Sequence, residues 1–130
     1  MTPAHILIVE DNELNKKLLR DVLQVEGHRT TETTTAEEGL VLAVATSPDL
    51  VLMDIHLPGM DGLEALRHLR ADPRTAAIPV VAVTASAMPL ERAAVLAAGF
   101  DGCFVKPLDV DEILVEVQRL LAARSTEPAP

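Results

Sequence analysis

The chain has 130 residues, the length of one domain, and its 48% hydrophobic residues allow a sizeable core. Its 20 acidic and 11 basic side chains give a net charge of −9, which makes it a poor candidate for binding nucleic acid directly. Its single cysteine, Cys103, excludes an internal disulfide and a cysteine-based zinc site, and we expect it to lie in the core. No signal peptide or membrane-length apolar run is present, so we expect a cytoplasmic protein that does not bind membranes.

Short apolar or β-branched runs predict five strands, at residues 5–9, 29–34, 50–54, 78–84 and 102–105. Helical periodicity and capping residues predict a helix after each strand. In the first helix, the stripe expected to face the core consists of Leu14, Leu18, Val22 and Val25, with Leu19 and Leu23 beside it. Strands that alternate with helices across short loops predict an α/β fold whose parallel sheet is covered on both faces.

The later helices have recognisable starts. A capping box at Thr35 opens the second helix, whose inward residues are expected to be Leu40 and Val44. Asp61 opens the third helix and Pro89 the fourth. The fifth is capped by Asp109 and Glu112, and its inward residues are expected to be Ile113, Val117, Leu120 and Leu121. We expect one domain over residues 1–123 and a disordered tail over 124–130.

Polar residues stand at the ends of four predicted strands: Glu10 with Asp11, then Asp54, Thr84 and Lys106. Because parallel strands end at one edge of a sheet, these side chains should meet where ligands bind in open α/β sheets. Three carboxylates close together repel one another, and a hard divalent cation such as Mg²⁺ relieves that repulsion. A carboxylate, Mg²⁺, a lysine and a hydroxyl together are suited to accepting a phosphoryl group, with Asp54 as the nucleophile.

The chain resembles the receiver domain of two-component response regulators from about Ala4 to Ala123. The matching motifs are Ile8-Val9-Glu10-Asp11-Asn12, Leu52-Met53-Asp54 to Asp61-Gly62, Val83-Thr84-Ala85 and Lys106-Pro107. The runs 9–15 and 78–85 look most like the DivK-type single-domain regulators of bacterial cell-cycle signalling. The resemblance implies a flavodoxin-like, CheY-like doubly wound (βα)5 fold with strand order 2-1-3-4-5.

The resemblance also implies the site chemistry. Asp54 would accept phosphate from a sensor histidine kinase or a histidine phosphotransfer protein. Mg²⁺, with Mn²⁺ as an alternative, would be held by the Asp11 and Asp54 side chains and the His56 backbone carbonyl, and Glu10 would act through a metal-bound water. Lys106 and Thr84 would bind the phosphoryl group. The surrounding loop residues are Ala85, Ser86 and Pro107, and the Lys106–Pro107 bond is a candidate cis peptide.

The family further implies a switch in which Thr84 moves toward the phosphoryl group and Phe104 turns inward. The face formed by the fourth helix, fifth strand and fifth helix would then be presented to downstream proteins. Phe104 lacks the hydroxyl that many members carry there, and the alternative is that it is simply a core residue. For His56, a loop histidine that contributes only its carbonyl is favoured over a catalytic side chain.

We therefore expect a stand-alone bacterial receiver, not an enzyme, whose own chemistry is limited to autophosphorylation and slow autodephosphorylation. It is expected to be a monomer, with phosphorylation-dependent dimerisation as an alternative. Competing hypotheses are a receiver fragment of a larger regulator or hybrid kinase, a degenerate receiver that signals without phosphate, and a Mg²⁺-dependent phosphatase with an Asp nucleophile. Such phosphatases usually carry a second Asp where this chain has His56.

Overall fold

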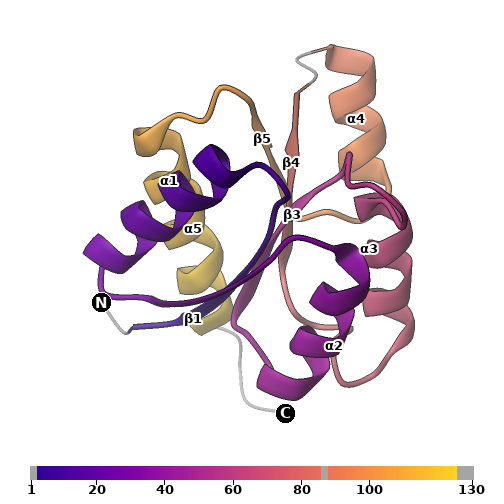
Figure 1. Ribbon diagram of the computed structural model, residues 1–130, viewed down its shortest axis with the longest axis horizontal. Helices are drawn as coiled ribbons and strands as arrows, with labels where there is room; N and C mark the ends of the chain where they lie inside the picture. Colours follow the sequence, from indigo (N-terminus) through magenta and orange to yellow (C-terminus); the bar gives the residue numbers. More distant parts are fainter. Residues whose placement is uncertain (1–2, 86–87, 126–130) are drawn as a thin grey trace.

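Five parallel strands form one sheet in the order β2-β1-β3-β4-β5, which confirms the predicted topology (Figure 1). The structure is a computed structural model that describes residues 3–85 and 88–125. The strands are β1 (His5–Val9), β2 (Arg29–Thr33), β3 (Leu50–Asp54), β4 (Val80–Thr84) and β5 (Gly102–Val105). Each pairs with its neighbour in parallel, so all five carboxyl ends lie along one edge.

Helices cover both faces of this sheet (Figure 1). They are α1 (Glu13–Val25), α2 (Ala36–Thr46), α3 (Gly62–Ala71), α4 (Pro89–Ala97) and α5 (Val110–Ser125). Helices α1 and α5 lie against one face, and α2, α3 and α4 lie against the other. Burial on both sides explains why the strand sequences are nearly continuous apolar runs instead of alternating patterns.

The sheet divides the core into two layers because successive strand side chains point to opposite faces. On β1, Leu7 and Val9 belong to the layer under α2, α3 and α4, whereas Ile6 and Ile8 belong to the layer under α1 and α5. Cys103 is buried in the first layer, as predicted. With so few aromatic residues, both layers are built mainly from aliphatic side chains.

Local capping explains where the helices begin. The side chains of Asn12, Thr35 and Asp61 each accept a hydrogen bond from a backbone amide three residues later, which confirms the predicted starts at Thr35 and Asp61. Asp109 likewise accepts from the Glu112 amide. Helix α4 differs because it begins with Pro89 and has no side-chain cap.

The core-facing stripe predicted for α1 needs correction. In α1, Leu14 and Val25 are 80% and 86% exposed, and the fully buried residues are Leu19 and Leu23. A 13-residue helix is about 20 Å long, whereas a five-residue strand spans about 16 Å, so the ends of α1 extend past the sheet. The expectation that Leu14 and Val25 face the core was therefore wrong.

In α2, the fully buried residues are the small ones, Ala36, Gly39 and Ala43; Leu40 is partly buried and packs against the core, as predicted, and Val44 is also partly buried. A Cβ at Gly39 would come within 2.9 Å of a Val9 methyl group, so this helix packs closely on the sheet. Helix α5 extends to Ser125, past the predicted end of the domain at 123. No helix within the described ranges is long and apolar enough to cross a membrane.

Candidate functional site

The structure brings the predicted polar residues together at the carboxyl edge of the sheet. Glu10 and Asp11 directly follow β1, Asp54 and Thr84 end β3 and β4, and Lys106 follows β5. These strands are neighbours in the order β1-β3-β4-β5, so the four strand ends form a continuous row. The predicted convergence of these side chains is therefore present in the fold.

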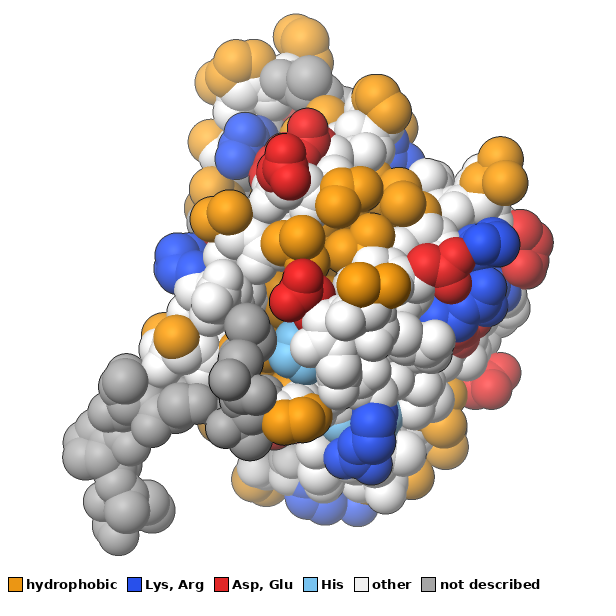
Figure 2. Space-filling model, turned by 90° about the vertical axis from the view of Figure 1, so that its left-hand side faces the viewer, with side chains coloured by type: hydrophobic (Ala, Val, Ile, Leu, Met, Phe, Trp, Pro, Cys, Tyr) orange, Lys and Arg blue, Asp and Glu red, His pale blue; other side chains and the backbone are white. Residues whose placement is uncertain are grey.

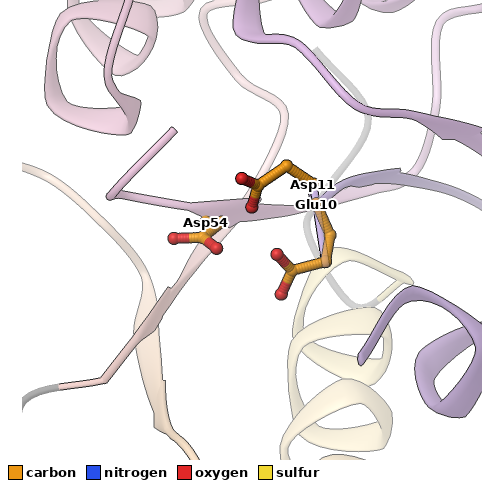
Figure 3. Close-up of side chains that lie close together, drawn as sticks. All are labelled: Glu10, Asp11 and Asp54. Atoms are coloured by element: carbon orange, nitrogen blue, oxygen red, sulfur yellow. The ribbon is translucent and has the colours of Figure 1, made fainter. Parts of the chain in front are cut away.

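Three carboxylates form the centre of the site. Glu10, Asp11 and Asp54 each offer an oxygen that lies within 4.8 Å of the others, and Figure 3 shows these groups gathered from the ends of two adjacent strands. Glu10 and Asp54 are buried, whereas Asp11 is exposed. The cluster is thus set into the protein on one side and open to solvent on the other.

Lys106 places a positive charge against the buried carboxylates. Its Nζ lies 2.8 Å from Asp54 Oδ2 and 3.1 Å from Glu10 Oε1. Two backbone amides fix the carboxylates further: the His56 amide donates to Asp54 Oδ1 at 2.8 Å, and the Asn12 amide donates to Glu10 Oε2 at 3.2 Å. Each acid is therefore oriented by the loop that follows its own strand.

The pKa values of the two buried acids, Glu10 and Asp54, are shifted in opposite directions. Burial, together with the nearby Asp54, raises the pKa of Glu10 from 4.5 to about 7. For Asp54, burial also favours the neutral form, but hydrogen bonds with Glu10, Lys106 and the His56 amide outweigh it and hold the pKa of Asp54 below its ordinary value. Asp54 is consequently the ionised member of the pair at neutral pH.

Lys106 stays charged for a related reason. Burial disfavours its ammonium group, but hydrogen bonds to Asp54 and Glu10 more than compensate, and the pKa of Lys106 rises above its ordinary value. One lysine cannot neutralise two adjacent carboxylates, so a negative charge remains when Glu10 and Asp54 are both ionised.

The donor set fits a hard divalent cation. Glu10 Oε1 is buried, and no described residue makes a hydrogen bond to it, although Lys106 lies within ion-pair distance. A carboxylate oxygen without a hydrogen bond, beside two further carboxylates, is suited to Mg²⁺ or Mn²⁺, which take oxygen ligands. The carboxylates at this site are therefore suited to the Mg²⁺ or Mn²⁺ ion that is predicted from the sequence.

The remaining predicted residues surround this centre. Thr84 is fully buried, and its backbone carbonyl accepts a hydrogen bond from the Lys106 amide at 2.8 Å. Phe104 is buried in the layer under α1 and α5. Ala85 and Pro107 are exposed, and the Lys106–Pro107 bond is cis. The predicted loop residue Ser86 lies outside the described residues.

His56 lies on the loop after β3, and its side chain is 59% exposed. Its Nε2 lies 3.8 Å from Oε1 of Glu91, in the first turn of α4. No sequence pattern predicts this contact, because Glu91 is distant along the chain and belongs to no motif. The expectation that His56 lies in a loop agrees with its position.

The comparisons with known proteins agree with this geometry. The family model described as "response regulator receiver domain" matches residues 6–118. A polar-differentiation response regulator, DivK of Brucella anthropi, is 40% identical over 119 residues, which cover 92% of this chain and 97% of that protein.

Two solved structures are similar over almost their whole length. The chemotaxis response regulator CheY4 of Vibrio cholerae is 25% identical, with a TM-score of 0.85 and coverage of 92% of this chain and 99% of that one. The receiver domain of a sensor histidine kinase from Pseudomonas aeruginosa PAO1 is 31% identical, with a TM-score of 0.85 and coverage of 93% and 99%. That structure has a magnesium ion coordinated in its active site cleft.

Proposed function

This chain belongs to the response regulator receiver family, and on that basis we propose that Asp54 is its phosphoryl acceptor. The observation that carries the proposal is the pairing of an ionised, buried Asp54 with Lys106 Nζ at 2.8 Å, at the sheet edge where three carboxylates meet. Phosphoryl transfer needs positioning and charge stabilisation, and this arrangement supplies both.

The residues divide the work of accepting the phosphoryl group. Asp54 is already a carboxylate at neutral pH, so its oxygen can attack phosphorus without a general base, and the donor leaves as the acyl phosphate forms. Lys106 would balance the charge on the phosphoryl oxygens, and the Thr84 hydroxyl would donate a hydrogen bond to one of them. The His56 amide holds Asp54 Oδ1 and so orients the attacking group.

Mg²⁺ or Mn²⁺ is part of the proposal. Asp11, Asp54 and the His56 carbonyl would hold the ion, and Glu10 would reach it through a bound water. The ion would supply positive charge that offsets the negative charge developing on the phosphoryl oxygens. Glu10 has to lose its proton to take part, and its raised pKa makes that step sensitive to pH near neutrality.

A protein is the proposed physiological donor, presenting a phosphohistidine from a sensor kinase or a phosphotransfer protein. Large hydrophobic residues are exposed in the first turns of three helices that begin at the acceptor edge: Leu14 in α1, Leu90 in α4 and Val110 in α5. Figure 2 shows hydrophobic side chains gathered in the middle of the side that bears α1 and α5, with acidic and basic side chains around them. Exposed hydrophobic residues of this kind are suited to binding a protein surface, more than to binding a small, hydrophilic phosphate donor.

The proposal also covers how phosphorylation is passed on to downstream proteins. We propose that phosphorylation changes the α4-β5-α5 face through Thr84 and Phe104, and that this face binds downstream proteins. The similarity to a polar-differentiation response regulator supports an output in cell-cycle control. The protein is proposed to act by binding, with its own chemistry limited to gaining and slowly losing one phosphoryl group.

Intact-protein mass spectrometry after incubation with acetyl phosphate tests the acceptor. Three proteins are incubated with acetyl phosphate, each with and without Mg²⁺: the wild type, Asp54→Asn and Asp61→Asn. Asp61 is a matched control because it lies in the loop after the same strand, and Asn caps a helix about as well as Asp. We expect one added phosphoryl group, dependent on Mg²⁺, in wild type and Asp61→Asn, and none in Asp54→Asn.

Three results would contradict the proposal. Modification of Asp54→Asn to the wild-type extent would place the acceptor elsewhere. Release of many equivalents of phosphate from a small ester such as p-nitrophenyl phosphate, with no trapped adduct, would indicate a phosphatase. If wild type stays unmodified, incubation with phosphorylated histidine kinases is the deciding measurement, and no transfer from any of them would reject the acceptor role.

A further inference from the structure

Helix α2 carries apolar residues on more than the face that it turns to the sheet. Residues 40–45 are all apolar, and Val41 is 67% exposed on the outer side of the helix. Leu40 and Val44 are half-buried. A helix that is hydrophobic all round is ordinarily covered on every side. No element of the described ranges covers Val41, so the outer side of α2 leaves apolar surface in contact with water.

A cavity lies beside this surface. Helices α2 and α3 are side by side (Figure 1), and a cavity of about 680 Å³ lies between the second half of α2 and the end of α3. Its lining includes Leu40, Val44 and Leu69, together with the exposed side chains of His68 and Arg74. A cavity of this size and composition can take up an apolar side chain from another molecule.

The loop between α3 and β4 holds this cavity in shape. The buried Thr75 hydroxyl donates to the Leu69 carbonyl at 2.7 Å, so this polar group in the lining is satisfied. The Arg74 side chain donates to both carboxylate oxygens of Asp72, at 3.1 Å and 2.8 Å, and the Arg74 amide donates to Asp72 as well. Because these contacts already fix the rim, binding there requires little ordering.

Charge is distributed unevenly along the same surface. Helix α2 begins at the acceptor edge, and its first turn carries the exposed acids Glu37 and Glu38. His68 and Arg74 lie at the opposite end, at the cavity. Asp72 accepts from two of the five guanidinium N–H groups of Arg74, so donors remain for a second carboxylate. The surface therefore has an acidic end, an apolar centre at Val41 and a basic end.

We propose that this surface pairs with the same surface of a second copy of the chain, in an antiparallel arrangement about a two-fold axis. Val41 of each copy enters the cavity of the other, which removes an exposed apolar side chain from water. The acidic first turn of one α2 then meets the basic end of the other, and the symmetry makes each contact twice. The pairing needs no phosphoryl group and does not depend on the proposed role of Asp54.

The pair is expected to be weak. The exposed apolar surface is small, and the net charge of −9 on each copy opposes association at long range. At about 150 mM salt the Debye length is about 8 Å, so repulsion between distant charges is screened while contacts within the interface persist. The pair should therefore form at high protein concentration in moderate salt.

Sedimentation equilibrium in this salt, at protein concentrations up to about 1 mM, measures the pairing. The test variant is Val41→Asp, and Val115→Asp is the matched control because Val115 is also 67% exposed but lies on α5. With rising concentration, the average mass of wild type and of Val115→Asp should approach twice the monomer mass. Val41→Asp should weaken association by about tenfold or more, because it places a charge in an apolar cavity.

Charge reversal tests the antiparallel arrangement. One variant combines Glu37→Lys with Glu38→Lys, and a second combines His68→Glu with Arg74→Glu. Each alone should pair about two- to fivefold more weakly than wild type, and an equimolar mixture should pair more strongly than either variant alone. The lysine variant has the lower net charge, so net charge alone would favour its own pairing over the mixture. Urea unfolding checks that each variant is folded.

Three outcomes would overturn the proposal. A wild type that keeps the monomer mass up to about 1 mM would leave the surface to a different protein. Association of Val41→Asp equal to wild type, or equal weakening by Val41→Asp and Val115→Asp, would place the contact elsewhere. A mixture that pairs no better than the lysine variant alone would reject the antiparallel arrangement. The role of Asp54 is tested separately by mass spectrometry, so the two proposals can fail independently.

Discussion

Charge balance among three residues decides the resting state of the acceptor site. Glu10 and Asp54 are buried side by side, and Lys106 supplies one positive charge to both. The proton therefore stays on Glu10 up to a pH of about 7, while Asp54 remains ionised and ready to attack. The residue that keeps the proton is thus a different one from the proposed nucleophile: burial raises the pKa of Glu10, whereas hydrogen bonds with Glu10, Lys106 and the His56 amide outweigh burial at Asp54 and lower its pKa.

At the same scale, Leu14 is predicted to be a contact for the protein donor. Leu14→Ser should lower the rate of phosphotransfer from a phosphorylated histidine kinase by about tenfold, because truncating an apolar anchor in an interface costs on that order. The rate of modification by acetyl phosphate should stay unchanged, since this small donor has no surface to dock. Quenched time courses with both donors measure the two rates.

Val25→Ser is the matched control for this prediction. Val25 is as exposed as Leu14 but lies at the opposite end of the same helix, away from the acceptor edge. It should leave both rates at the wild-type value. Equal slowing by Leu14→Ser with both donors would show that Leu14 acts on the site itself and not on the donor.

At the scale of elements, Gly62 fixes how closely α3 approaches the acceptor strand. A Cβ at this position would lie 2.7 Å from the Asp54 carbonyl oxygen and 2.7 Å from Ile55 Cα, and both of these are backbone atoms. Gly62→Ala should therefore displace Asp54 or the start of α3, and destabilise the protein by about 1–3 kcal/mol. We expect modification by acetyl phosphate to slow by about tenfold or more, because small misplacements of reacting groups carry large penalties.

Gly27→Ala separates the local effect from general destabilisation. Gly27 has φ of +91°, and no atom beyond its own residue and its two chain neighbours lies within 4 Å of where its Cβ would be. Its substitution should cost about 1–2 kcal/mol through the backbone conformation alone. Urea unfolding and the acetyl phosphate rate distinguish the two variants: a Gly62→Ala protein with the rate of Gly27→Ala would mean that the close approach does not position Asp54.

Arg70 joins three elements at the opposite edge of the sheet. Its guanidinium donates to the carbonyl oxygens of Ala76, Ile78 and Gly99 and to the carboxylate of Asp101. The same Asp101 oxygen accepts from the backbone amide at the start of β4. The end of α3, the start of β4 and the turn before β5 are therefore held by one side chain.

Arg70→Met should lower the free energy of unfolding by about 1–3 kcal/mol, because three carbonyl oxygens, two of them in part-buried hydrogen bonds, and a carboxylate lose a charged donor. Arg67→Met is the control, since Arg67 is exposed on the same helix and should change stability by less than about 0.5 kcal/mol. Urea denaturation of both variants makes the comparison. Equal stability of the two variants would show that solvent replaces the Arg70 contacts at no net cost.

These elements also show what a sequence can predict. The five strands were predicted because each is a short apolar or β-branched run that ends on a polar residue, and parallel topology then places Asp54 and Lys106 at one edge. The exposure of Leu14 was not predicted, since helical periodicity does not reveal that α1 is longer than the strands beneath it. The Arg70 contacts and the His56–Glu91 contact join residues far apart in the chain, and only the folded geometry brings them together.

At the scale of the whole molecule, stability should depend on pH through the acceptor site. The folded-state pKa of Glu10, about 7, lies above its value of 4.5 in an unfolded chain, so between these values the folded protein binds more protons. The contribution of Glu10 to stability is therefore fully present below pH 4.5 and is lost as the pH rises through 7. Asp54 acts in the opposite direction, with stability lost as the pH falls below its ordinary value.

Without divalent cations, the free energy of unfolding should therefore fall between about pH 5 and pH 8, as Glu10 ionises beside Asp54. Millimolar Mg²⁺ should remove most of that fall, because a bound cation favours the ionised carboxylates and stabilises the folded state that holds it. Glu10→Gln should flatten the Mg²⁺-free profile, since it keeps the shape of the side chain and cannot ionise. Urea titrations across this range, with EDTA or Mg²⁺, make the measurement. A Glu10→Gln profile that falls as steeply as wild type would place the pH dependence outside this site, whereas a wild-type profile that Mg²⁺ leaves unchanged would mean that the carboxylates do not hold the ion.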